Sequence, residues 1–280
     1  MSRYRVTHKT GFKYSGSVVA SYNEARMLPA RDDGQLVFQS RLEIRPHTAS
    51  HEYQDFFNTR TVMFEVLEPH EELQIISHSS VEIRASRTVV SNHSWEQIET
   101  AVPGSLVLTD ALMQTRRTQP PADLVKFARK IKTANSPSET ALAVCKKVFE
   151  SMTYKHGVTG VNSVATEAWG SKIGVCQDFT HVVIGVLRAV GLPARYVSGY
   201  LHPKKNPVLG ETVVGESHAW VEWWAGDWVA YDPTNDNEVI DRHIVVGRGR
   251  DYDDVAPLRG VYAGSVTSEL FVSVEITKEA

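Results

Sequence analysis

The stretch from Gly174 to Tyr200 constrains the fold more than any other part of this chain. It reads as a glycine turn, a cysteine, an apolar run, a stop at Gly191 and Pro193, and then a strand. This order predicts a helix that begins at Cys176 and ends before the stop. The unpaired N–H groups and the helix dipole at that end stabilise a thiolate, and the same N–H groups can donate to a developing oxyanion.

The composition is that of an ordinary soluble protein. A length of 280 residues suggests one or two domains. The net charge of −3 offers no basic field, so neither nucleic acid nor an anionic membrane is expected as a partner. The first residues lack an apolar run of signal-peptide length, and no later stretch reaches about 18 apolar residues. We therefore expect a cytoplasmic location.

Residue patterns divide the chain into a strand-rich part and a mixed part. Residues 1–90 show short alternating runs separated by turn formers, which predicts an N-terminal β-sandwich or barrel. Residues 91–121 contain Pro-Gly and Pro-Pro breakers and are interpreted as a connection. Residues 122–280 combine helical and strand patterns and form the expected second domain, with the C-terminal strand included. The predicted fold class is therefore α+β.

The two cysteines lie in different settings. A helix is expected over 122–131, and a second runs from about 138 to Met152, with Ser136 or Ser138 as its cap. On the second helix, Cys145 shares an apolar face with Leu142, Phe149 and Met152. Free cysteine packs as a small hydrophobe, so Cys145 is predicted to be a core thiol.

Downstream of Cys176, a tryptophan-rich hairpin supplies two further candidates. His218 opens one apolar strand, and Asp232 closes the next, with a turn at 225–227 between them. If the strands pair, both side chains lie at the same open end, although the sequence does not fix the register. Nucleophilic cysteine catalysis needs a thiolate, a base and a group that orients the base. Each residue taken alone also has a structural interpretation: a helix-start cysteine, a strand histidine and a turn aspartate.

These segments resemble a known family. The motifs are Gly174-Val-Cys-Gln-Asp-Phe, Leu192-Pro-Ala-Arg-Tyr-Val-Ser-Gly-Tyr, His218-Ala-Trp-Val-Glu and Asp232-Pro-Thr. They are similar to the core of the transglutaminase-like superfamily, in the papain-like fold group, and to its bacterial branch, which is often described as cysteine proteases. The N-terminal third is similar to the β domain that precedes the core in that branch.

The resemblance implies a role for each candidate. Cys176 would be the nucleophile, His218 the general base and then acid, and Asp232 the carboxylate that orients it. The backbone N–H of Cys176 is the first expected oxyanion donor. An indole N–H can serve as a second donor in the family, which points to Trp169, and a packing role for Trp169 is the alternative.

The expected reaction is acyl transfer on an amide or peptide bond through a thioester. Hydrolysis of a peptide or protein amide is favoured over crosslinking, by analogy with the bacterial branch. A transamidating transglutaminase is the first alternative. A catalytically silent protein- or peptide-binding module is an alternative of another class.

Neither a metal nor an organic cofactor is expected. The cleft candidates lack His-x-x-x-His and Cys-x-x-Cys spacing, and no phosphate loop is present. Asp178, in the first turn after Cys176, is predicted to cap the helix rather than to take part in catalysis. His181 is expected in the core or behind the site.

Overall fold

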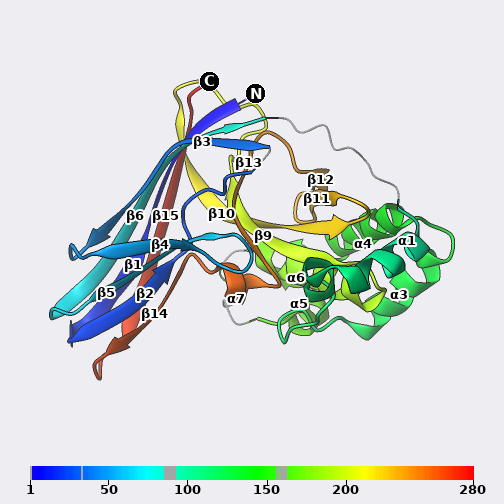
Figure 1. The fold of residues 1–280 in the computed structure, drawn as a ribbon, viewed down its shortest axis with the longest axis horizontal. Helices are drawn as coiled ribbons and strands as arrows, with labels where there is room; N and C mark the ends of the chain where they lie inside the picture. Colours follow the sequence, from blue (N-terminus) through cyan, green and yellow to red (C-terminus); the bar gives the residue numbers. More distant parts are fainter. Residues whose placement is uncertain (1, 33, 85–92, 156, 158–162) are drawn as a thin grey trace.

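The computed structural model describes residues 2–32, 34–84, 93–155, 157 and 163–280. It has the predicted α+β fold, with a splayed set of long strands on one side and helices packed on a sheet on the other (Figure 1). Both ends of the chain lie close together at one edge of the strand-rich half (Figure 1).

The strand-rich half is a sandwich of two sheets, here called the sandwich domain. The first sheet contains β3 (Gln35–Arg45), β6 (His70–Ile83), β1 (Ser2–Val18) and β15 (Ser268–Lys278). The second contains β4 (Ser50–Gln54), β5 (Arg60–Val66), β2 (Ala20–Ala25) and β14 (Leu258–Ala263). Buried side chains from both sheets form one apolar core, which confirms the predicted β-sandwich; they include Val18, Ile44, Val62, Phe64, Leu73 and Ile75.

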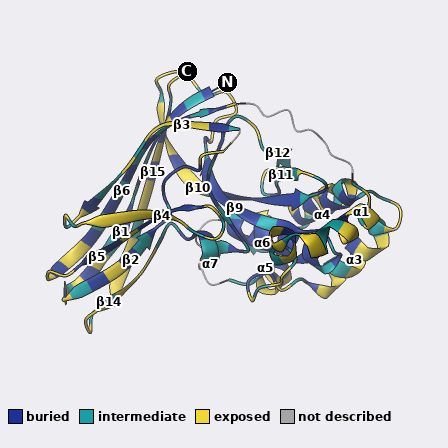
Figure 2. Cartoon of the chain, viewed as in Figure 1, coloured by how far each residue is buried: buried dark blue, intermediate teal, exposed yellow. Residues whose placement is uncertain are grey.

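Alternation of apolar and polar residues sets the faces of these strands. Along β6, every second residue from Leu73 to Ile83 is buried, Ser77 and Ser79 included, and the residues that alternate with them are partly exposed. Successive side chains of a strand point to opposite faces, so this pattern buries one face and leaves the other to solvent. The strands of the sandwich domain accordingly carry alternating dark blue and yellow segments (Figure 2).

The C-terminal strand belongs to the sandwich domain, whereas the sequence pattern placed it with residues 122–280. Strand β15 pairs with β1 in antiparallel register from Tyr4 opposite Lys278 to Tyr14 opposite Ser268. Strand β14 likewise pairs with β2. A strand pattern shows that a segment is extended, but it carries no information on which distant segment completes its hydrogen bonds.

One sheet runs through both halves of the molecule. The first residues of β10 (Thr212–Trp224) pair with β15, and from Glu216 onward the same strand pairs with β9 (Ala194–Leu201). Strand β10 then pairs with β11 (Trp228–Asp232), which pairs with β12 (Asn237–Glu238), while β13 (His243–Gly249) flanks β9. The shared strand β10 therefore ties the sandwich domain to the second, core domain.

Helix α6 (Cys176–Ala189) is the centre of the core domain. Every residue from Gln177 to Arg188 is buried, because α6 packs on β9 and β10 and is covered by other helices. These are α3 (Ala122–Lys132), α4 (Pro137–Ser151) and α5 (Ala165–Ser171). The central strands beside α6 are mostly dark blue (Figure 2).

The predicted helices and the predicted connection appear with some added detail. The expected helix over 122–131 is α3, and Ser136 is the cap of α4, in a capping box with Glu139. Within the connection, the described residues form α1 (Trp95–Ala101), η1 (Val102–Gly104) and α2 (Leu106–Asp110). Short elements complete the domain: β7 (Thr153–Tyr154), β8 (Ile173–Gly174) and α7 (Tyr252–Val255). The predicted boundary at 90–91 lies outside the described residues.

No helix among the described residues combines the length and the apolar character that a bilayer span requires. The cytoplasmic location stays a prediction.

Candidate active site

Local chain geometry explains why α6 begins at Cys176. The preceding Val175 is extended, and its N–H donates to Asp178 Oδ2 at 2.8 Å. Ser163 donates its hydroxyl to the other oxygen of the same carboxylate. A Cβ on Gly174 would lie only 2.8 Å from Asp178 Oδ2, so the turn requires glycine. The predicted capping role of Asp178 is confirmed.

The two thiols have opposite environments. Cys176 is partly exposed at the start of α6, where the first-turn N–H groups lack intrahelical acceptors. Cys145 is fully buried in the apolar core beneath α6, as predicted. Burial raises the pKa of the Cys145 thiol well above its usual range. Of the two, Cys176 is therefore the thiol that a substrate can reach.

The tryptophan-rich hairpin brings His218 and Asp232 together. Its register pairs Val221 with Tyr231 and Trp224 with Trp228 across the turn. This pairing leaves both candidates at the open end, where His218 Nε2 lies 2.7 Å from Asp232 Oδ2. The hydrogen bond that the sequence left undetermined is therefore formed.

Asp232 is fully buried and accepts several hydrogen bonds. Oδ1 accepts from the backbone N–H groups of Thr234 and Asn235 at 3.0 and 3.2 Å. Besides His218, Oδ2 accepts from the side-chain amide of Asn235 at 2.7 Å and lies 3.3 Å from His243 Nε2. Burial alone would raise the pKa of this carboxyl group, but these bonds hold it well below its usual range. The carboxylate is therefore charged.

His218 connects Asp232 to Cys176. Burial by itself would lower the pKa of His218, but hydrogen bonds to Asp232 and to the Cys176 side chain outweigh it. Negative charge on both partners adds to the effect and raises the pKa of His218 to about 10. The imidazole is consequently protonated at neutral pH. The three residues predicted from sequence thus form one contiguous chain of contacts.

Trp169 uses its indole N–H elsewhere. Nε1 donates to both carboxylate oxygens of Asp123, at 3.0 Å each, and the ring is largely buried in the core. The Lys172 ammonium lies 3.0 Å from the centre of the ring. These contacts match the packing role, which was the alternative expected for Trp169. The oxyanion role of Trp169 stays a prediction.

Sequence reasoning missed His243. The Ile240 N–H donates to His243 Nδ1 at 3.2 Å, so Nε2 carries the proton that points to Asp232. His243 is fully buried, and burial lowers its pKa. It is thus a neutral donor behind Asp232. His243 opens β13, the second strand after Asp232, and only the pairing of β13 with β9 places its ring beside the Asp232 carboxylate.

Tyr154, which lies near Cys176, and its hydrogen-bond partner Glu216 were also missed. Tyr154 is the last residue of β7, whose pairing with β8 sets it opposite Gly174, two residues before Cys176. Burial and nearby Cys176 raise the pKa of Tyr154 well above its usual range, and its hydroxyl hydrogen-bonds to Glu216. Glu216 stands two residues before His218 on β10, and this period-two spacing could have suggested a shared face.

His181 is a core residue, as expected. It is fully buried, its Nε2 accepts from the Tyr252 N–H at 3.2 Å, and its ring packs against Tyr196. Burial lowers the pKa of His181 to about 3, so the ring is neutral.

His218, Asp232 and His243 also place ligand-type atoms within 4.8 Å of one another. The separation of 2.7 Å between His218 Nε2 and Asp232 Oδ2 is that of a hydrogen bond. Two ligands of a tetrahedral zinc ion, each about 2.0 Å from the metal, stand about 3.3 Å apart. The arrangement therefore fits proton sharing, and the expectation of no metal stays a prediction.

Two family descriptions match this chain. The transglutaminase-like superfamily matches residues 125–233, which contain the Cys176, His218 and Asp232 positions. The bacterial transglutaminase-like N-terminal region matches residues 4–82.

Several known proteins are similar to this one. An uncharacterized protein of Mycobacterium leprae is 40% identical over 284 residues and covers 100% of both chains. An uncharacterized protein of Mycobacterium tuberculosis is 36% identical over 292 residues, with 98% of this chain and 92% of that protein covered. A protein-glutamine gamma-glutamyltransferase of Pseudomonas aeruginosa is 36% identical over 86 residues, 29% of this chain and 13% of that protein.

The fold also has a solved counterpart. The crystal structure of a candidate cysteine protease from Cytophaga hutchinsonii superposes with a TM-score of 0.76 at 20% identity. The similarity covers 98% of this chain and 90% of that one, so the two share both the sandwich and the core domain. With its N-terminal region and its core both matched, the chain belongs to the transglutaminase-like superfamily.

Proposed function

We propose that this protein is a thiol-dependent acyl-transfer enzyme that acts on an amide or peptide bond. Cys176 is the nucleophile, His218 the general base and acid, and Asp232 the group that orients His218. One observation carries the proposal: the His218 ring bonds to Asp232 at 2.7 Å and to the partly exposed Cys176 side chain. A buried carboxylate, an imidazolium and a reachable sulfur in one line are the parts that such chemistry needs.

The proposed reaction has two stages. The Cys176 sulfur attacks the carbonyl carbon, and the C=O electron pair moves to oxygen. The tetrahedral intermediate collapses as His218 gives its proton to the leaving nitrogen, which releases ammonia or an amine and leaves a thioester. Water then attacks the carbonyl carbon of the thioester, and His218 takes a proton from that water molecule. Loss of the thiolate yields the carboxylic acid and restores the ion pair of Cys176 with protonated His218.

The start of α6 supports stabilisation of the oxyanion. The Cys176 N–H belongs to the first turn of a fourteen-residue helix, where the dipole is positive and acceptors within the helix are lacking. This N–H is therefore the first proposed oxyanion donor. Trp169 donates to Asp123, so we assign it no part in the proposed reaction.

Hydrolysis is the favoured outcome, and transamidation is a second candidate. The relative of Pseudomonas aeruginosa is named a protein-glutamine gamma-glutamyltransferase, and its matched segment is 36% identical to this chain. In transamidation, a primary amine replaces water in the second stage, and the other steps are unchanged. Peptide or protein amides are the proposed substrates in both cases.

Alkylation tests the nucleophile without knowledge of the substrate. We expect iodoacetamide at neutral pH to modify Cys176 in the folded protein and to spare Cys145, as read by peptide mass spectrometry. His218→Ala removes the cation that pairs with the sulfur, so alkylation of Cys176 should slow by about tenfold or more. The exposed His47→Ala is the matched control and should react like the wild type. Preferential labelling of Cys145 would overturn the assignment.

A glutamine-containing peptide separates hydrolysis from transfer. The peptide is incubated with and without a primary amine, and ammonia, free acid and amine conjugate are measured. Hydrolysis predicts free acid at a rate that the amine does not change. Conversion of most product to the conjugate at millimolar amine would favour the transamidase instead. Cys176→Ala is the control and should give neither product.

A further inference from the structure

A cavity of about 220 Å³ lies between the two domains, away from the triad. Its walls come from the turn that contains Phe57 and from residues near the ends of core-domain elements. Helix α6 begins with Cys176 and reaches the cavity at Arg188, and β11 begins at the cavity with Trp228 and ends with Asp232. The cavity therefore occupies the end of these elements opposite the triad and is a separate site.

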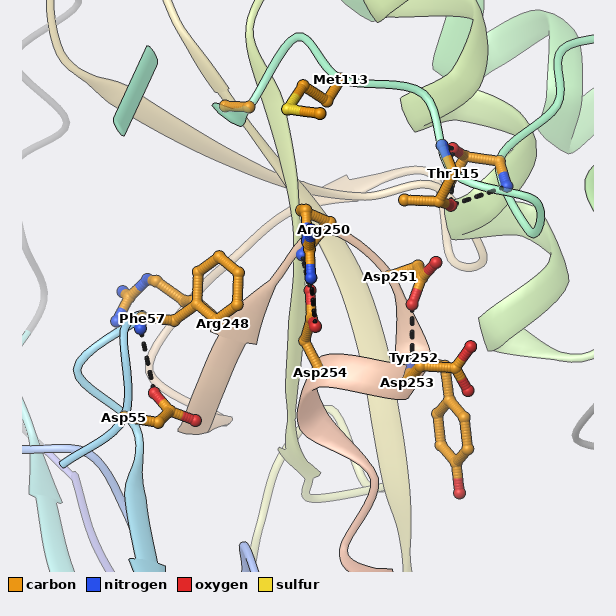
Figure 3. Close-up of polar contacts among 12 residues, drawn as sticks. Asp55, Phe57, Met113, Thr115, Arg248, Arg250, Asp251, Tyr252, Asp253 and Asp254 are labelled. Carbon is orange, nitrogen blue, oxygen red and sulfur yellow. Dashed lines mark hydrogen bonds and ion pairs between the residues drawn. The ribbon is translucent and has the colours of Figure 1, made fainter. Parts of the chain in front are cut away.

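Aromatic rings with fixed positions supply the apolar surface of the cavity. The Phe57 turn is rigid because Asp55 Oδ1 accepts the backbone N–H groups of Phe57 and Thr59 at 3.0 and 2.9 Å. The Arg195 guanidinium stacks 3.7 Å from the centre of the Trp228 ring. In Figure 3, the Phe57 side chain lies close to Arg248 and Arg250.

Four arginines line the cavity, but their hydrogen bonds differ. Arg188 donates hydrogen bonds to the backbone carbonyls of residues 111, 113, 194 and 250 and to one threonine hydroxyl. It therefore links several segments of the cavity wall. Arg195 and Arg248 share the buried Glu222. Arg250 binds Asp254 through Nε and Nη2, as the dashed lines in Figure 3 show.

Groups of both signs remain available to a ligand. Arg195 and Arg250 use Nε and Nη2 for their carboxylates, and their Nη1 atoms have no partner among the described residues. The Asp110 side chain, also in the wall, likewise has no hydrogen-bond donor among the residues that the structure describes, since only its backbone carbonyl accepts, from the Met113 N–H. Partial burial raises the pKa of Asp110, although the nearby charges of Arg250 and Arg188 act in the opposite direction.

Charged groups of both signs surround the cavity. Four guanidinium groups line it, and the carboxylates near them are Glu222, Asp254, Asp251, Asp32 on Arg248, and Asp110 in the wall itself. A ligand with a net negative charge would gain from the free Nη1 atoms but would be repelled by Asp110. A ligand that carries one group of each sign satisfies both and adds no net charge to the cavity.

We propose that this interdomain cavity binds a free α-amino acid with an aromatic side chain. The α-carboxylate bonds to Nη1 of Arg195 or Arg250, the α-ammonium to Asp110, and the ring packs on Phe57 and Trp228. The volume of about 220 Å³ equals that of about seven water molecules at about 30 Å³ each, which suits a single ring rather than a peptide. Pockets at domain interfaces with an apolar lining and a few convergent polar groups are typical ligand sites.

Calorimetry with three probes on the wild-type protein tests the proposal. The probes are L-phenylalanine, 3-phenylpropanoate, which lacks the ammonium, and 2-phenylethylamine, which lacks the carboxylate. For a ligand of this size, we expect L-phenylalanine to bind with a Kd on the order of 1 mM and each truncated probe about tenfold more weakly. The proposal is overturned if L-phenylalanine shows no saturation at about 20 mM, or if either truncated probe binds equally well or better.

Two variants assign the contacts. Asp110→Asn should weaken L-phenylalanine binding about tenfold and leave 3-phenylpropanoate binding unchanged or improved, because only the former carries an ammonium. Arg250→Gln should weaken both. Arg45→Gln, at an exposed pair with Glu43 in the sandwich domain, is the matched control. An unchanged affinity for L-phenylalanine in Asp110→Asn contradicts the proposal, and circular dichroism melting checks that each variant folds. Since the readout is binding, it is independent of the activity proposed for Cys176.

Discussion

Replacement of Asp232 by asparagine is expected to remove the charge of His218 at neutral pH. The pKa of His218 is raised from 6.5 to about 10 in spite of burial, by hydrogen bonds to Asp232 and Cys176 and by their charges. The difference between pKa values of 6.5 and about 10 corresponds to about 5 kcal/mol in favour of the imidazolium. Asparagine keeps the shape of the side chain without its charge, while the burial of His218 persists. We therefore expect the pKa of His218 to fall below about 7 in Asp232→Asn.

Nuclear magnetic resonance of isotope-labelled histidine measures this change directly. The ring signals of His218 are followed over a pH series in the wild type and in Asp232→Asn. Cys176→Ala should lower the same pKa in part, because it removes the second hydrogen bond and the second negative charge. Asp227→Asn is the matched control, since this exposed carboxylate belongs to the same hairpin and only caps its turn. A His218 that still titrates near 10 in Asp232→Asn would refute the reasoning.

The raised pKa of His218 also makes the stability of the folded protein depend on pH. The pKa of His218 is higher in the folded state than its ordinary value of 6.5. Its contribution to stability is therefore complete below about pH 6.5 and is lost as the pH rises through about 10. Urea unfolding of the wild type at several pH values should show this decline, and the decline should be smaller in Asp232→Asn.

Three further changes test the packing around the site. Gly185→Ala should lower the free energy of unfolding by about 3 kcal/mol in urea, since a Cβ would lie 1.9 Å from the Thr118 carbonyl oxygen; Gly104→Ala, with nothing within 4 Å, is the control. Glu222→Gln should cost about 3 kcal/mol at neutral pH, because it removes the buried charge that pairs with Arg195 and Arg248 and leaves Arg248 with Asp32 alone. Burial opposes ionisation of Glu222, but these arginines lower its pKa to about 2, so the gap between variant and wild type should shrink as the pH falls from about 4.5 toward 2. His243→Leu removes one donor to the triad carboxylate and should cost about 2 kcal/mol, read by the same unfolding assay.

Local patterns predicted the parts of the candidate site that depend on neighbours in sequence. The glycine turn and the apolar run placed Cys176 at a helix start, and the structure has α6 begin there. The turn between two apolar strands predicted the hairpin that carries His218 and Asp232. These predictions succeed because helix ends and tight hairpins are set by the residues within them.

Contacts between distant segments could not be predicted in this way. Nothing near Trp169 in sequence indicates that Asp123 takes its indole N–H. The donor from His243 to Asp232 depends on the placement of β13 beside β9. The pair of Tyr154 and Glu216 joins two strands that lie in different sheets.

Periodicity, turn residues and chain order were enough to predict the α+β class, a cysteine at a helix start and the residue types of the candidate triad. The pairing of β15 with β1, the hydrogen bond between His218 and Asp232, and the arginine-lined cavity between the domains became visible only in the folded chain. These features could not be predicted because hydrogen-bond partners, burial and the resulting pKa values depend on which segments meet in space. A local sequence pattern shows which hydrogen-bonding and titratable groups a segment carries, whereas packing decides which partners those groups meet.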